Sequence, residues 1–188
     1  MRCKFVVSVV LLLLSVSIAA AQEDYDYSRF SYKAEAFGNI GSTSWDYGNS
    51  GLLFGGGVLF RPYPKAGFEI QFRRVQADED EYSAPGVFQR NEERGLIFTG
   101  AVHYYFSEMR FQPYVLLGGG YASRHSKNHY RDLEFEHRSE FEESSVVMEA
   151  GTGVNIFLTN KISVRPDVRL MLGAITSVQG SANLCYHW

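Results

Sequence analysis

Apolar and polar residues alternate with a period of two in eight separate runs of this chain. This alternation predicts β-strands with one apolar and one polar face, whereas an amphipathic helix would repeat about every 3.6 residues. Each run covers about 10 to 12 residues, roughly twice the usual strand of a soluble domain. The sequence therefore predicts eight long strands. The alternation is clearest within residues 30–36, 52–60, 68–73, 96–104, 114–121, 146–156, 164–170 and 178–188, and the runs extend a few residues beyond several of these ranges.

The lengths and spacings of these runs indicate strands that cross a membrane. A tilted strand needs about 9 to 11 residues to span a bilayer. The connections alternate between long polar segments and short turns, although the last one, near 173–176, is short on the long-loop side. Short turns at one end and longer loops at the other are typical of outer-membrane barrels. We therefore predict an all-β fold, an eight-stranded antiparallel transmembrane up-and-down β-barrel. The long connections lie near 41–50, 76–93 and 124–143, and the short ones near 61–66, 107–110 and 159–161.

The first 21 residues have the features of a removable signal peptide. A basic start is followed by an apolar run over 5–18, too short for a spanning helix, and by three alanines that suit a cleavage site. We expect residues 1–21 to be the signal peptide, 22–28 a short periplasmic N-terminal segment and 29–188 the barrel. The protein should then reside in the bacterial outer membrane.

Removal of the leader changes the charge and the cysteine content. Arg2 and Lys4 leave with it, so the net charge moves from -3 to -5, which disfavours nucleic acid as a partner. Cys3 leaves as well, and Cys185 then has no cysteine with which to form an intramolecular disulfide. A mean hydropathy of -0.17 with 21% charged residues excludes a helical membrane protein, and 45% hydrophobic residues exclude a disordered chain.

Alternation alone does not say which face points inward, and a soluble lipocalin-like barrel would place the apolar face inside. Three features favour apolar residues outside. Glycines accompany the charged residues, as a narrow interior requires. Aromatic residues gather near the short turns, as at a membrane interface, and the chain ends within the apolar alternation. The glycines are Gly55, Gly57, Gly118, Gly120, Gly151 and Gly153, and the aromatic residues are Phe30, Tyr32, Phe60, Phe68, Tyr104, Phe106 and Phe111.

Several segments resemble the eight-stranded outer-membrane barrels typified by outer membrane protein A. They are HYYF at 103–106, FQPYV at 111–115 and LGGGY at 117–121. The series Leu184, Tyr186 and Trp188 resembles the signal read by the barrel-assembly machinery, although Phe is the usual last residue. The resemblance covers 32–188 and implies that machinery, outer-membrane lipid and lipopolysaccharide as partners. It implies little about activity, because function does not follow from fold.

Eight charged residues share the predicted inward face, and their charges cancel. Charges in a confined lumen are costly unless they are paired, so we predict a salt-bridge network that fills the barrel. A narrow channel for small solutes is the alternative, although a selective pore more often has an excess of one sign. The predicted interior network comprises Lys33, Glu35, Glu69, Arg73, Glu149, Arg165, Asp167 and Arg169.

The long segment 124–143 contains candidates for chemistry, namely His125, His129 and His137. No helical pattern would bring these histidines onto one metal, so we expect no metal and no cofactor. The run RHSKN at 124–128 invites comparison with the His-x-Ser-Asn motif of lipid A deacylases, but here His and Ser are adjacent. We therefore expect no enzyme, with a lipid A-modifying enzyme as the second alternative.

The same segment alternates in part, which predicts a hairpin that continues past the membrane and could bind a surface partner by strand addition. The simpler interpretation is a solvated loop, as it is for the acidic run over 78–81. From the sequence alone we predict a non-enzymatic structural or surface-interaction protein.

Overall fold

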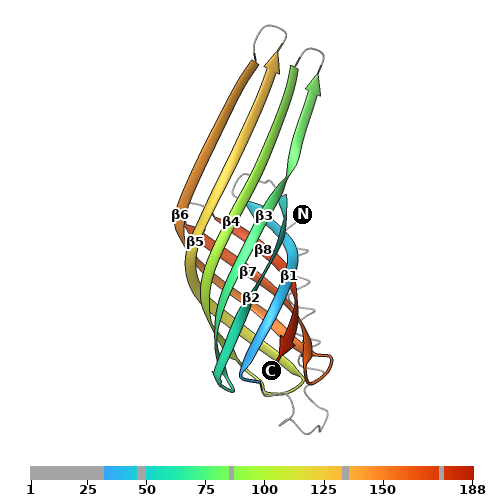
Figure 1. The fold of residues 1–188 in the computed structure, drawn as a ribbon, viewed down its shortest axis with the longest axis vertical. Coiled ribbons are helices and arrows are strands. Elements are labelled where there is room, and N and C mark those ends of the chain that lie inside the picture. Colours follow the sequence, from blue (N-terminus) through green and yellow to red (C-terminus); the bar gives the residue numbers. More distant parts are fainter. Residues whose placement is uncertain (1–31, 46–49, 85–86, 133–135, 174–175) are drawn as a thin grey trace.

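The computed structural model describes residues 32–45, 50–84, 87–132, 136–173 and 176–188. Eight strands form a closed barrel in which each strand pairs antiparallel with its neighbour along the chain and β8 pairs with β1 (Figure 1). This confirms the predicted up-and-down barrel. No helix in the described ranges is long and apolar enough to cross a membrane. The strands are β1 (Ala34–Trp45), β2 (Ser50–Tyr63), β3 (Ala66–Ala84), β4 (Val87–Tyr105), β5 (Phe111–Asp132), β6 (Glu136–Phe157), β7 (Ile162–Gly173) and β8 (Ser177–His187).

The alternation in the sequence becomes the two faces of the wall. In β3, Glu69 and Arg73 point inward and are 0–1% exposed, whereas Phe68 and Phe72 are 46% and 49% exposed on the outer face. Successive side chains of a strand point to opposite sides of the sheet. The barrel therefore has a polar interior and an apolar exterior, as the charged phase and its glycines predicted.

Glycines on the inner face allow neighbouring strands to approach closely. A Cβ atom on Gly55 would overlap the carbonyl oxygen of Phe72, and one on Gly120 would overlap that of Phe98. Because no side chain fits in so little space, glycine is required there. The interior is consequently narrow, and long side chains from other strands fill it.

Four strands are longer than the sequence predicted. β3 and β4 have 19 residues each, and β5 and β6 have 22 each. The segments 76–93 and 124–143, which we expected to be long loops, are therefore mostly strand. In 124–143 the favoured interpretation, a solvated loop, is wrong for most of the segment, and the structure has the alternative hairpin instead. β3 and β4 extend beside it as a second hairpin, so that four strands rise well above the barrel (Figure 1). Above a membrane both faces of a sheet meet water, so the apolar alternation that marks a strand is lost there.

The first strand begins later than predicted. β1 starts at Ala34 and extends to Trp45, whereas the sequence placed its run at 30–36 and a loop from 41. The predicted signal peptide and the boundary between 22–28 and 29–188 lie outside the described residues and stay predictions. The short turns fall where they were expected, at one end of the barrel.

Candidate functional site

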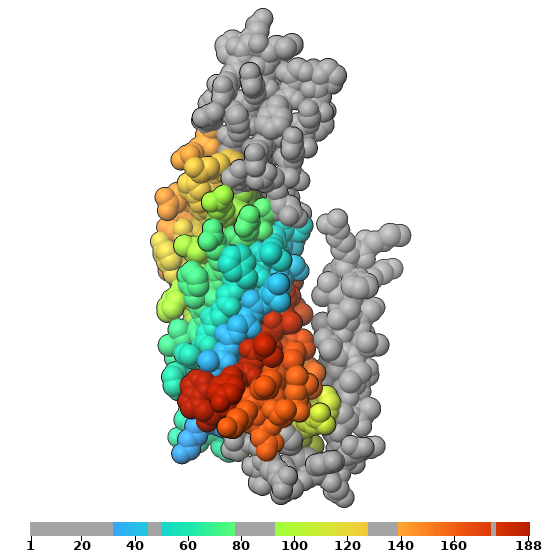
Figure 2. Space-filling view, turned by 45° about the vertical axis from the view of Figure 1, so that its right-hand side comes forward, coloured from blue at the N-terminus to red at the C-terminus, as the bar shows by residue number. Residues whose placement is uncertain are grey.

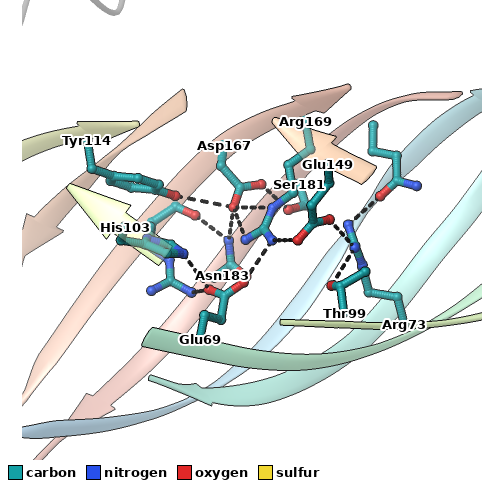
Figure 3. Close-up of polar contacts among 12 residues, drawn as sticks. Glu69, Arg73, Thr99, His103, Tyr114, Glu149, Asp167, Arg169, Ser181 and Asn183 are labelled. Atoms are coloured by element: carbon teal, nitrogen blue, oxygen red, sulfur yellow. Dashed lines mark hydrogen bonds and ion pairs between the residues drawn. The ribbon is translucent and has the colours of Figure 1, made fainter. Parts of the chain in front are cut away.

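Arg169 on β7 is the centre of the charged interior (Figure 3). Its Nη1 donates to Glu69 Oε1 at 2.7 Å and to Glu149 Oε1 at 3.3 Å, and its Nη2 donates to Asp167 Oδ2 at 2.9 Å. These acids come from β3, β6 and β7, so one guanidinium joins three strands of the wall. A planar guanidinium suits this role because its donors form a rigid fork.

Arg165, four residues earlier on β7, extends the chain of ion pairs toward β1. Its Nη1 lies 2.5 Å from Glu35 Oε1 and its Nη2 lies 2.9 Å from Glu69 Oε2. The guanidinium also lies 4.4 Å from the ring centre of Phe37. Glu69 therefore binds both arginines of β7, one with each carboxylate oxygen.

Arg73 on β3 extends the chain in the other direction. Its Nη2 donates to Glu149 Oε2 at 2.5 Å and to Thr99 at 2.9 Å, and its Nη1 donates to Gln179 at 2.6 Å (Figure 3). Because Glu149 also binds Arg169, the ion pairs run without interruption from β1 across the lumen to β3. The order is Glu35, Arg165, Glu69, Arg169, Glu149 and Arg73.

Neutral groups complete the pairing of Asp167. Ser181 donates to its Oδ1 at 2.5 Å, while the Tyr114 hydroxyl and the Asn183 amide lie 3.2 Å and 3.3 Å from its Oδ2 (Figure 3). His103 Nε2 lies 3.3 Å from Glu69 Oε2. These residues were not predicted from the sequence, although all four occupy inward positions of their strands.

The network is sealed from water. The seven predicted network residues that lie on strands are between 0% and 5% exposed, so almost none of their surface can contact water. An apolar layer lies on the side of the network that faces the extended hairpins, and a partly aromatic cluster lies toward the short turns. The apolar layer consists of Leu53, Val75, Ile97, Ala122, Val147 and Met171, and the periplasmic cluster of Tyr32, Phe37, Leu59, Phe157 and Cys185.

One member of the predicted network is wrong. Lys33 is exposed, because it precedes the first strand and the alternation of β1 does not reach it. Arg61 on β2 is buried in its place, with Nη1 donating to Gln112 at 2.7 Å and the guanidinium over the rings of Tyr32 and Tyr105. The balance of four positive and four negative charges is thus kept with a different cation. Continuing the inward phase of β2 beyond Leu59 would have identified Arg61.

Tyr32 also departs from its expected position. The sequence predicted it in the outer aromatic girdle, but it is 8% exposed and its ring centre lies 4.1 Å from that of His187. Beside it, His187 Nε2 lies 2.7 Å from Ser163 Oγ, and His187 Nδ1 lies 3.5 Å from Glu35 Oε2. The order of groups resembles a serine–histidine–carboxylate triad. However, Ser163 and His187 are at most 2% exposed and Glu35 also binds Arg165, so the group is a buried polar cluster at the end of the barrel with the short turns.

The three residues of the predicted assembly signal lie together on the outer face at the end of the chain. Leu184, Tyr186 and Trp188 are 62%, 50% and 60% exposed, and the ring centres of Tyr186 and Trp188 are 6.3 Å apart. Cys185 points inward and is buried, as a residue that fills the barrel. Recognition of the series by the assembly machinery stays a prediction.

The remaining candidates lie on the extended hairpins. His125 is half-buried on β5, while the side chains of His129, His137 and the acidic run 78–81 lie outside the described residues. In the part of the chain whose side chains are described, no three His, Cys, Asp or Glu residues are grouped closely enough to hold a metal ion.

Replacement of Glu149 by alanine tests whether the ion pairs stabilise the barrel. Glu149→Ala removes the partner of Arg73 and one partner of Arg169, and breaking a buried pair costs about 3 to 5 kcal/mol. We expect a loss of about 3 kcal/mol in the free energy of unfolding, measured in urea with the barrel in lipid vesicles. Glu140→Ala removes an exposed pair with Lys127 and should leave stability unchanged. Equal stabilities of the two variants would contradict a structural role for the network.

Substitution of Trp188 tests the assembly signal. An aspartate there would put a charge on the outer face at the membrane interface, so Trp188→Asp should lower the amount of folded barrel in outer membranes. Trp188→Phe keeps an aromatic ring and should assemble normally. The readout is the gel mobility of unheated samples, in which a closed barrel migrates differently from the unfolded chain. Normal assembly of Trp188→Asp would show that the barrel-assembly machinery does not recognise the C-terminal series.

Comparison with known proteins agrees with this geometry. The family model described as outer membrane protein beta-barrel domain matches residues 8–182. Ail, the attachment invasion locus protein of Yersinia pestis, is similar in structure, with a TM-score of 0.54 and 10% identity over 84% of this chain and 100% of Ail. The N-terminal barrel domain of Pseudomonas aeruginosa OprF has a TM-score of 0.52 and 11% identity over 84% of this chain and 100% of that domain.

A major outer membrane protein from Thermus thermophilus is similar to the same extent, with a TM-score of 0.53 and 11% identity over 82% of this chain and 99% of its own. No curated protein sequence matches the chain significantly. At these identities the solved structures show a shared fold. The family model covers most of the sequence, and the chain therefore belongs to the outer membrane protein beta-barrel domain family.

Proposed function

We propose that this barrel is a non-enzymatic, non-conducting outer-membrane protein that holds a rigid sheet above the membrane as a surface for interaction. The closed, non-conducting lumen is supported by the burial of the charge network, whose arginines and glutamates on β1, β3, β6 and β7 are 0–1% exposed. A conducting pore needs water beside its charged groups, and a selective one usually has an excess of one sign. Here every strand-borne acid of the network has an arginine partner.

The apolar layer above the network supports the same conclusion. Ile97, Val75 and Met171 have no exposed surface, and the layer takes one side chain from each of the six strands β2 to β7. Ions do not enter an apolar constriction that water does not wet. Two barriers of different chemistry therefore lie in series.

The extended strands support a role of the sheet above the membrane as a surface for interaction. β4 pairs with β5 as far as Val87 and Asp132, and β5 pairs with β6 as far as Arg131 and Glu136. The register of β6 with β7 begins only at Val147, so the part of β6 before it pairs with β5 alone among the described strands. Such an open edge can accept a further strand. Exposed Phe141 and Val146 lie along this edge.

Bilayer recordings test the closed lumen. The wild-type barrel should show no steady ion conductance, because the network and the apolar layer both block it. A triple variant, Ile97→Ala with Glu149→Ala and Met171→Ala, removes volume from both barriers and should conduct, which shows that the assay detects an open barrel. Steady wild-type currents whose ion selectivity changes in Glu149→Gln would favour the alternative, a narrow channel.

Amide hydrogen exchange tests the extended sheet. Amides of β5 between 124 and 131 should be protected, because strands flank them on both sides. In β6, alternate amides between 139 and 146 should exchange rapidly, since they point to the open edge. Rapid exchange throughout this part of β5 would mean that it is a loop in solution. Slow exchange of every β6 amide would mean that the edge is covered.

A further inference from the structure

The outer wall has an apolar depression of about 360 Å³ where β1, β8 and β7 meet. These strands run side by side in Figure 2, coloured blue, red and orange. Opposite Tyr186 and Leu184 of β8 lie the small residues Ala36 and Gly38 of β1, so the wall is hollowed between larger side chains. Ile162 of β7 borders the depression on the other side. The depression lies on the face that the alternation assigns to lipid.

Two exposed lysines lie at the periplasmic end of this depression. Lys161 directly precedes Ile162, and its carbonyl oxygen accepts a hydrogen bond of 2.8 Å from the His187 amide. The Lys33 carbonyl oxygen accepts a hydrogen bond of 2.8 Å from the Arg61 amide, and the amide of the next residue, Ala34, donates to a main-chain oxygen of Trp188 at 3.4 Å. Both lysines therefore lie at the last backbone hydrogen bonds of the wall, at the end with the short turns.

The rest of this rim is also basic. Lys65 and Arg110 are exposed in two other turns, and Glu108 is the exposed acid among the described residues of the turns at this end. In outer-membrane barrels the end with short turns faces the periplasm. The depression thus combines an apolar groove, interfacial aromatic residues and positive charge in the order in which a phospholipid presents its chain, glycerol and phosphate.

We propose that this depression is a binding site for one anionic phospholipid of the periplasmic leaflet. An acyl chain fills the hollow over Ala36 and Gly38, and the phosphate pairs with Lys33 and Lys161. Binding of this lipid does not depend on whether the lumen conducts. The occupant is a phospholipid because the site is at the end of the barrel opposite the extended hairpins.

Quenching of Trp188 fluorescence by brominated lipids tests the site. The chain has two tryptophans, so Trp45→Phe leaves Trp188 as the reporter beside Tyr186. The barrel is reconstituted in phosphatidylcholine vesicles with either brominated phosphatidylglycerol or brominated phosphatidylethanolamine. We expect half-quenching at a mole fraction of phosphatidylglycerol on the order of tenfold lower, since each lysine near a surface favours an anionic lipid. The variant Lys33→Gln with Lys161→Gln should abolish this preference.

A second pair of variants separates the groove from general surface charge. Gly38→Leu fills the hollow, and an added Cβ there meets only the Gly55 carbonyl oxygen at 3.9 Å, so the wall tolerates it. This variant should weaken quenching by both lipids. Gly180→Leu is the matched control, because nothing lies within 4 Å of its Cβ and it does not line the depression. Folding of each variant is checked by gel mobility of unheated samples.

Three outcomes would overturn the proposal. The first is equal quenching of the wild-type barrel by the two brominated lipids. The second is a preference that Lys65→Gln lowers as much as the paired lysine variant does, which would indicate diffuse attraction to the rim. The third is a Gly38→Leu variant that behaves like Gly180→Leu, which would mean that no acyl chain occupies the hollow.

Discussion

A continuous chain of ion pairs crosses the lumen and joins strands that are not neighbours in the sheet. An eight-stranded barrel has an interior just wide enough for side chains, and here arginines span it and bind acids on distant strands. Arg169 joins β3, β6 and β7, and Arg165 joins β1, β3 and β7. Because the desolvation of charges is costly, each buried guanidinium stabilises the barrel only while the strands of the wall hold its acidic partners in place. The closed sheet and the network therefore specify one another.

The glycines of the inner face follow from the same constraint. Arg73 is opposite Gly55 in the β2–β3 register, and Arg169 is opposite Gly151 in the β6–β7 register. A glycine opposite each of these two arginines leaves room for the long side chain to extend into the lumen. Paired charged side chains and glycines therefore take the place that an apolar core has in a soluble domain. Among the described residues, apolar side chains also cluster above and below the network.

The sequence predicted the fold because the period of two is a direct consequence of strand geometry. It also predicted the acids of the network and three of its arginines, since Glu69, Arg73 and their counterparts sit within runs whose phase is unambiguous. The errors fall at strand ends. Lys33 and Tyr32 precede β1, where the alternation no longer determines which way a side chain points. Arg61 lies one residue past the predicted run of β2. Partners such as Gln179 and Tyr114 depend on the shear of the barrel, which the sequence pattern does not contain.

The two ends of the barrel differ in the length of their strands and in their charge. At the end with the long strands, pairing of β3 to β6 continues far beyond the other strands, and backbone hydrogen bonds and cross-strand pairs such as Lys127 with Glu140 join that sheet. At the periplasmic end the strands stop within a few residues of the aromatic girdle, and exposed lysines follow at once. One end of the barrel is long and polar, and the other is short and basic. To invert in the membrane, the barrel would have to move these charged groups through the apolar part of the bilayer, which is costly. The same asymmetry separates an open sheet edge at one end of the barrel from a basic rim at the other.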